Sequence, residues 1–145
     1  MSTNKTLILG CSILKWWSGI NFVLSFLILV IVVTKLGNSP LFSMVFKPEE
    51  VNELPQKVIK AMNTLTILYN SYAVAMSIMV WFVVKNALSN GERWAFWVLL
   101  ITIGIAEVFA FIASAPFNHT RWQVNAVLSL LYLVGMTLVG FGLFG

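Results

Sequence analysis

Four long apolar stretches constrain the fold of this 145-residue chain more than any other feature. They run over about 14–34, 62–84, 94–115 and 123–144. A helix needs roughly 20 apolar residues to cross the hydrocarbon core of a bilayer. The composition agrees, because 59% of the residues are hydrophobic, 10% are charged and the mean hydropathy is +0.91. The sequence therefore predicts an integral membrane protein with four crossings, and it excludes a soluble domain or a disordered chain.

The lengths of the connections predict how these crossings are arranged. The segments 85–93 and 116–122 are short, so the crossings that they join must pack antiparallel. We expect an all-α, up-down-up-down four-helix bundle that forms a single transmembrane domain over residues 1–145. The termini and the 85–93 turn then share one side of the membrane, the terminal side. The 35–61 loop and the 116–122 turn share the other, the loop side. The first helix can extend backwards to begin near Thr6.

Local signals refine the connections. Pro48-Glu49-Glu50 is typical of a helix start, with proline in the first turn and acids at the positive end of the dipole. Pro55 predicts a second start that leads into the second crossing. Pro116 ends the third helix, and the segment 89–92 can cap its beginning. We also expect a short amphipathic segment on the membrane surface, formed by Phe42, Met44, Val45 and Phe46 beside Lys47.

Charge and rare residue types exclude several function classes. The net charge is +4, but the nine basic residues are spread over several loops, so we expect no nucleic-acid partner. Cys11 is the only cysteine, and an intrachain disulfide is impossible. One histidine and no aspartate leave too few ligands for a zinc or di-iron site, so we expect neither a metal nor another cofactor.

Basic residues are nearly balanced between the two sides, so the positive-inside rule does not set the orientation. The terminal side holds Lys5, Lys15, Lys85 and Arg93, and the loop side holds Lys35, Lys47, Lys57, Lys60 and Arg121. Our working hypothesis is a bacterial inner-membrane protein with cytoplasmic termini. All six tryptophans fall within reach of a membrane boundary, as interfacial tryptophans do.

Glu107 is the acidic residue at membrane depth. It lies 13 residues after Trp94, which places it roughly 20 Å from the terminal side at 1.5 Å per residue. Desolvation favours its neutral acid form, whereas a nearby Arg121 or Asn70 favours the carboxylate. Two interpretations stay open: Glu107 serves a ligand or a reaction, or it bonds a neighbouring helix and fixes the register.

Other polar residues share this depth. We predict a polar pocket between the second, third and fourth crossings that opens towards the loop side. Its residues are Glu107, Tyr69, Asn70, Asn125, Ser129 and Tyr132, with His119 and Arg121 at its mouth. On the fourth crossing Asn125, Ser129 and Tyr132 share one face, because they are spaced i, i+4 and i+7.

The residues near the boundaries also allow two interpretations each. His119 is either a proton shuttle at the pocket mouth or a solvated loop residue. Arg121, beside Trp122, either anchors the helix at the interface or captures a lipid headgroup. Lys15 either extends its ammonium group to the interface or binds an anionic headgroup with Lys85 and Arg93.

The turn between the second and third crossings carries a resemblance. Gly91-Glu92-Arg93-Trp94-Ala95-Phe96-Trp97 is similar to the G-E-R-W-A-x-W turn of small uncharacterised bacterial four-helix membrane proteins, some of them grouped as DoxX-like. The match covers seven residues and the four-crossing plan, and it implies no catalytic residue.

Three functions follow as hypotheses. We expect a non-enzymatic protein that binds a lipid or another lipophile, or an accessory subunit of a membrane complex. The alternatives are a small membrane enzyme that moves a proton with Glu107 on an apolar substrate, and a transporter. The catalytic residues stay unknown because no nucleophile–base pair is recognisable. Expected partners are membrane lipids, a lipophilic ligand, and further copies or subunits.

Overall fold

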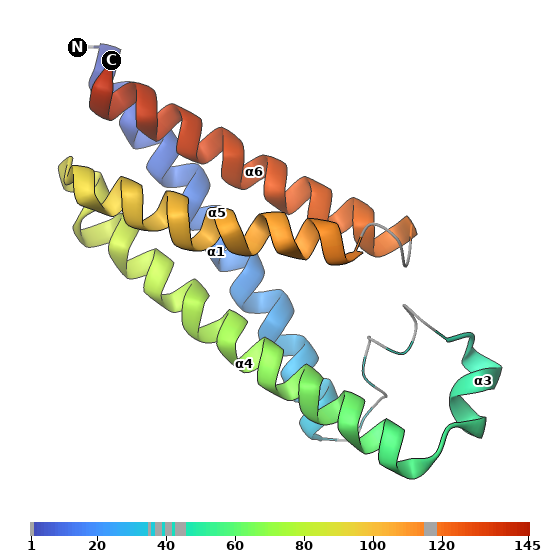
Figure 1. Cartoon of the computed structure of the whole chain (residues 1–145). Helices are drawn as coiled ribbons and strands as arrows, with labels where there is room; N and C mark the ends of the chain where they lie inside the picture. The colour runs from blue at the N-terminus through green and yellow to red at the C-terminus, as the bar shows by residue number, and fades with distance from the viewer. Residues whose placement is uncertain (1, 35, 37–38, 40–41, 43–45, 115–118) are drawn as a thin grey trace. The chain divides into compact units, whose positions relative to one another are not determined.

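The computed structural model describes residues 2–34, 36, 39, 42, 46–114 and 119–145, and these contain helices and turns but no strand (Figure 1). In chain order the helices are α1 (Ser2–Val33), α3 (Pro48–Glu53), α4 (Gln56–Asn86), the 3-10 helix η1 (Leu88–Asn90), α5 (Arg93–Ser114) and α6 (His119–Phe144). The predicted all-α fold class is confirmed.

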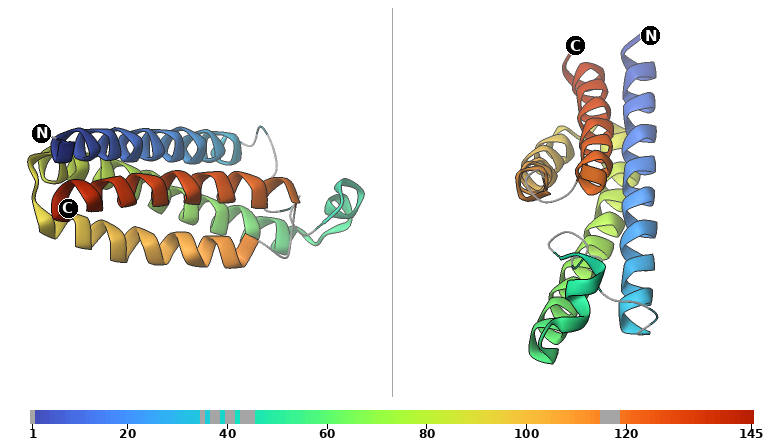
Figure 2. Two further views of the ribbon diagram at one scale, coloured as in Figure 1. Left: turned by 90° about the horizontal axis from the view of Figure 1, so that it is seen from above. Right: turned by 90° about the vertical axis from the view of Figure 1, so that its right-hand side faces the viewer.

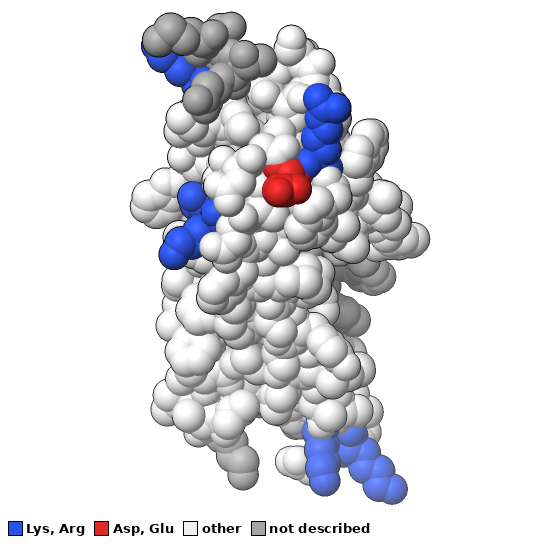
Figure 3. Space-filling view, turned by 90° about the vertical axis from the view of Figure 1, so that its left-hand side faces the viewer, with Lys and Arg blue, Asp and Glu red and all other residues white. Residues whose placement is uncertain are grey.

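Four of the described helices are long and apolar enough to span a membrane: α1, α4, α5 and α6. Most of the surface drawn in Figure 3 carries neither a basic nor an acidic side chain. The chain is therefore a multi-pass integral membrane protein, consistent with the predicted four-helix bundle. Three helices begin several residues before the predicted crossings, α1 at Ser2, α4 at Gln56 and α6 at His119, because a helix can continue beyond the hydrocarbon core.

The chain divides into two compact units. Unit 1 comprises residues 1–20 and 78–145, and unit 2 comprises residues 21–77. Helices α1 and α4 each contribute residues to both units. The single transmembrane domain over 1–145 stays a prediction.

In unit 1, the first half of α1 packs closely against α6 (Figure 2). A Cβ atom added to Gly10 would lie 2.7 Å from the backbone nitrogen of Val139, and one added to Gly142 would lie 2.7 Å from that of Leu7. Further along, the rings of Trp17 and Tyr132 have centroids 5.5 Å apart. Since the numbers rise on α1 while they fall on α6, the two helices are antiparallel.

Helix α6 also packs antiparallel to α5. The Phe96 ring, in the first turn of α5, lies 5.3 Å from the Phe144 ring at the end of α6. Deeper in the helix pair, the Tyr132 hydroxyl of α6 donates a hydrogen bond of 2.9 Å to the Leu99 carbonyl of α5. This pairing sets the register that brings the deeper polar residues of the two helices together.

A tight turn connects α4 to α5. Gly91 adopts a left-handed conformation with φ 83°, and its N–H donates to the Leu88 carbonyl. The Ser89 hydroxyl donates to the Val84 carbonyl at 2.7 Å, so it satisfies the end of α4. At the start of α5, the Glu92 carbonyl accepts from the Ala95 N–H. Within the predicted capping segment 89–92, the Ser89 side chain thus bonds to the end of α4, and Glu92 is the residue directly before α5.

Unit 2 contains α3 and ties the preceding loop to α4. The Glu50 carboxylate accepts from the Lys47 backbone N–H at 2.7 Å, which fixes the start of α3. The Ser39 N–H donates to the Asn63 side chain at 3.1 Å, and the hydroxyls of Ser39 and Thr66 share a hydrogen bond. Helix α4 begins directly after Pro55, as predicted.

Part of the predicted amphipathic segment lies outside the described residues, namely Met44 and Val45, as does Pro116. Phe42 is buried, and its ring lies 6.4 Å from the half-buried Phe46 ring. The placement of this segment on the membrane surface stays a prediction.

Candidate functional site

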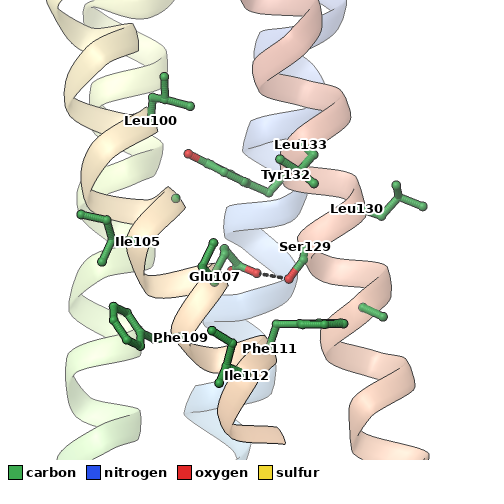
Figure 4. Close-up of a pocket in the computed structure, with 13 residues that line it drawn as sticks. Leu100, Ile105, Glu107, Phe109, Phe111, Ile112, Ser129, Leu130, Tyr132 and Leu133 are labelled. Atoms are coloured by element: carbon green, nitrogen blue, oxygen red, sulfur yellow. Dashed lines mark hydrogen bonds between the residues drawn. The ribbon is translucent and has the colours of Figure 1, made fainter. Parts of the chain in front are cut away.

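A groove of about 710 Å³ lies between α5 and α6 in unit 1 (Figure 4). Its lining residues all belong to these two helices, and the polar side chains among them are those of Glu107, Ser129 and Tyr132. Six large apolar residues that line the groove are more than half exposed on the surface of the protein: Ile105, Val108, Phe109, Ile112, Leu130 and Leu133. The groove is therefore open to the side, along the membrane-spanning part of the helix pair.

Glu107 and Ser129 meet inside this groove. The Ser129 hydroxyl donates a hydrogen bond of 2.5 Å to Oε2 of Glu107, and Figure 4 shows the two side chains pointing toward each other. Both residues are half-buried. Glu107 lies about 21 Å along α5 from Arg93, at a rise of 1.5 Å per residue, so the carboxyl group is deep in the span.

The charge of Glu107 has no partner among the described residues that line the groove, because these include no Lys, Arg or His. A carboxylate removed from water is costly unless it is paired and hydrogen-bonded. The Ser129 hydroxyl supplies one hydrogen bond but no opposite charge. This arrangement leaves the site able to hold a proton or a cationic group at Glu107.

Tyr132 closes the inner side of the groove. Its side chain is 2% exposed, its hydroxyl donates a hydrogen bond to the Leu99 carbonyl, and its ring packs against Trp17. Tyr132 thus lines the groove, but its hydroxyl already joins α6 to α5.

The remaining predicted residues lie elsewhere or outside the described side chains. Asn125 is half-buried one turn before Ser129 and is not part of the lining. Tyr69 and Asn70 belong to unit 2, where the Asn70 amide donates to the Thr66 carbonyl at 2.8 Å. The side chains of His119 and Arg121 lie outside the described part of the chain. A contribution of these residues to the pocket stays a prediction.

Sequence reasoning missed the small residues that make the groove hollow. An added Cβ at Gly104 would meet only the Tyr132 hydroxyl, at 3.7 Å, so open space lies beside this glycine. Ala126 lines the groove from α6. The signal was present in the sequence, since each is a small residue near the depth of Glu107 on a helix that was expected to face it.

Across the described residues, no three His, Cys, Asp or Glu side chains gather into a group that could hold an ion. The chemistry available in the groove is that of one carboxyl group beside one hydroxyl.

No family model, curated protein or solved structure matches this chain. The resemblance of residues 91–97 to DoxX-like proteins therefore stays a prediction. The groove itself is the basis on which a function can be proposed.

Proposed function

We propose that this protein binds a membrane lipid or another lipophile in the α5–α6 groove, without transforming it. The observation that carries the proposal is an apolar groove with one carboxyl group, open to the side within the membrane-spanning helices. Ligand sites typically measure roughly 300–1,000 Å³ and combine apolar walls with a few polar groups. The groove, at about 710 Å³, has this size and this composition.

The walls and the carboxyl group have separate roles in such a site. The apolar side chains of α5 and α6 hold the hydrocarbon part of the ligand, and Glu107 holds its polar group. The bond to Ser129 occupies one oxygen of Glu107. A carboxyl group accepts more hydrogen bonds than one hydroxyl supplies, so Glu107 retains capacity for a ligand while it also joins the helices.

The finer localisation is also a proposal. We place the protein in a bacterial inner membrane with both termini in the cytoplasm, and the bacterial assignment rests on the resemblance of the 91–97 turn. The alternative role, as an accessory subunit of a membrane complex, is tested by the same experiment as the binding function.

Native mass spectrometry after gentle extraction from the membrane tests the binding function. The wild-type protein should retain a small lipophile. Ala126→Leu fills the groove with a larger apolar side chain and should reduce the retained lipophile about tenfold, which corresponds to about 1.4 kcal/mol. The matched control is Thr102→Val, because Thr102 is exposed on α5, is absent from the groove and bonds to the Val98 carbonyl.

Equal retention by the wild type and Ala126→Leu would contradict the proposal. A partner protein retained by the wild type and by Glu107→Gln would instead indicate an accessory subunit, with Glu107 joining helices only. A lipophile whose mass changes on incubation with the protein would indicate an enzyme.

A further inference from the structure

We infer that the α5–α6 groove selects lipophilic cations, meaning amphiphiles that carry one protonated amine on an apolar tail. This inference rests on the proposed function and names the chemical class of its ligand. Three features of the groove support it: the charge of its lining, the direction of its hydrogen bonds and its aromatic side chains.

The first feature is the imbalance of charge. Glu107 contributes an acid to the lining, and the described lining residues contribute no base. A cationic ligand supplies the missing opposite charge, and the attraction is stronger in an apolar site than in water. A neutral lipophile supplies no such charge, and an anionic one is repelled by the carboxylate.

The second feature is the direction of the hydrogen bonds. Ser129 donates to Glu107, and Tyr132 donates to the Leu99 carbonyl. The hydroxyl protons are therefore directed to acceptors of the protein, and an ionised Glu107 can only accept. The group that complements it is a donor with a positive charge, such as an ammonium N–H.

The third feature is aromatic. Phe109 and Phe111 line the groove from the helix that carries Glu107, and Figure 4 shows Phe111 extending from α5 toward α6. The face of an aromatic ring attracts a cation within about 6 Å of the ring centre. Phenylalanine side chains accept an alkyl chain equally well, so they suit both ends of a lipophilic cation.

A pair of probes of equal chain length tests the selectivity. Dodecylammonium and dodecanol differ at the head group, and the amine is protonated at neutral pH because an alkylamine resembles the lysine side chain. Binding of each radiolabelled probe is measured with the full chain in lipid nanodiscs. We expect the wild type to bind dodecylammonium at least about tenfold more tightly than dodecanol, a difference of about 1.4 kcal/mol.

Three variants test the contribution of the Glu107 charge separately from that of the shape of the groove. Glu107→Gln should weaken dodecylammonium binding by about tenfold or more and change dodecanol binding by less than about twofold. Glu92→Gln is the matched control, since it removes the same charge from an exposed position before α5 and should change neither affinity. Ala126→Leu should weaken both probes, because it fills the groove without altering its charge. Circular dichroism verifies that each variant remains helical.

The contrary outcomes are distinct from failure of the proposed function. Equal affinity of the wild type for both probes, unchanged in Glu107→Gln but reduced in Ala126→Leu, overturns the cation selectivity and leaves lipophile binding in place. If neither probe binds to the wild type or to any variant, both the lipophile binding and the cation selectivity are overturned. If the absence coincides with a dimer in native mass spectrometry, a second copy of the chain covers the groove.

Discussion

At the residue scale, the two glycines of α1 differ in whether a side chain would fit at their positions. A Cβ atom on Gly10 would lie 2.8 Å from the Gly135 carbonyl oxygen and 2.7 Å from the Val139 nitrogen, both of them backbone atoms that cannot move aside easily. A Cβ atom on Gly19 would have no neighbour within 4 Å. Small residues of this kind allow membrane helices to approach closely, and of the two glycines of α1, Gly10 serves that purpose and Gly19 does not.

We therefore predict opposite effects for the same substitution on one helix. Gly10→Ala should lower the free energy of unfolding by about 1–3 kcal/mol, the usual cost of overpacking. Gly19→Ala should leave the stability unchanged or raise it by up to about 1 kcal/mol, because alanine is the better helix former. Thermal unfolding in one detergent measures both. Equal unfolding temperatures for the two variants would show that the α1–α6 contact does not depend on Gly10.

At the scale of elements, the α4–α5 turn depends on the backbone of one residue. Gly91 has φ 83°, a conformation that most L-residues avoid, and an added Cβ would meet no atom within 4 Å. Any effect of a substitution at Gly91 therefore comes from the backbone conformation and not from a clash.

Because no clash is involved, two substitutions at Gly91 test its backbone conformation directly. Gly91→Val should destabilise the protein by about 1–2 kcal/mol, because a β-branched residue is disfavoured in the left-handed region. Gly91→Asn should cost clearly less, since asparagine visits that region more readily. Chemical unfolding followed by helical circular dichroism provides the comparison. A valine variant as stable as the asparagine variant would contradict a left-handed Gly91.

At the scale of the whole molecule, four membrane-spanning helices determine which segments share a side of the membrane. Glu92 and Lys57 are both exposed. Glu92 lies directly before α5, and Lys57 lies in the first turn of α4. An intact crossing by α4 separates them, so they must lie on opposite sides.

Labelling with a membrane-impermeant maleimide in sealed vesicles of known orientation tests this topology. In a Cys11→Ser background, Glu92→Cys should react from one side and Lys57→Cys from the other, with Glu92→Cys on the cytoplasmic side under the proposed orientation. The N-terminal Lys5→Cys variant should react from the same side as Glu92→Cys. Reaction of Glu92→Cys and Lys57→Cys from one side would contradict a crossing by α4.

The sequence alone determined the number of spans and the depth of the polar residues. Run length fixes a crossing because the apolar core of a bilayer has a fixed thickness, and the rise per residue fixes depth along a helix. By depth, Glu107, Ser129 and Tyr132 were expected near one level, and the structure places all three in the lining of one groove.

Only the tertiary structure decided what each polar group contacts and where space remains. Depth does not fix the rotation of a helix about its axis, which depends on packing against several neighbours at once. Close contact with α1 and α5 orients α6 so that the Tyr132 hydroxyl reaches the Leu99 carbonyl, while Asn125 stays outside the lining. The same packing leaves open space beside Gly104. A hollow exists only where the side chains of two facing helices fail to fill the space between them, and that requires both surfaces.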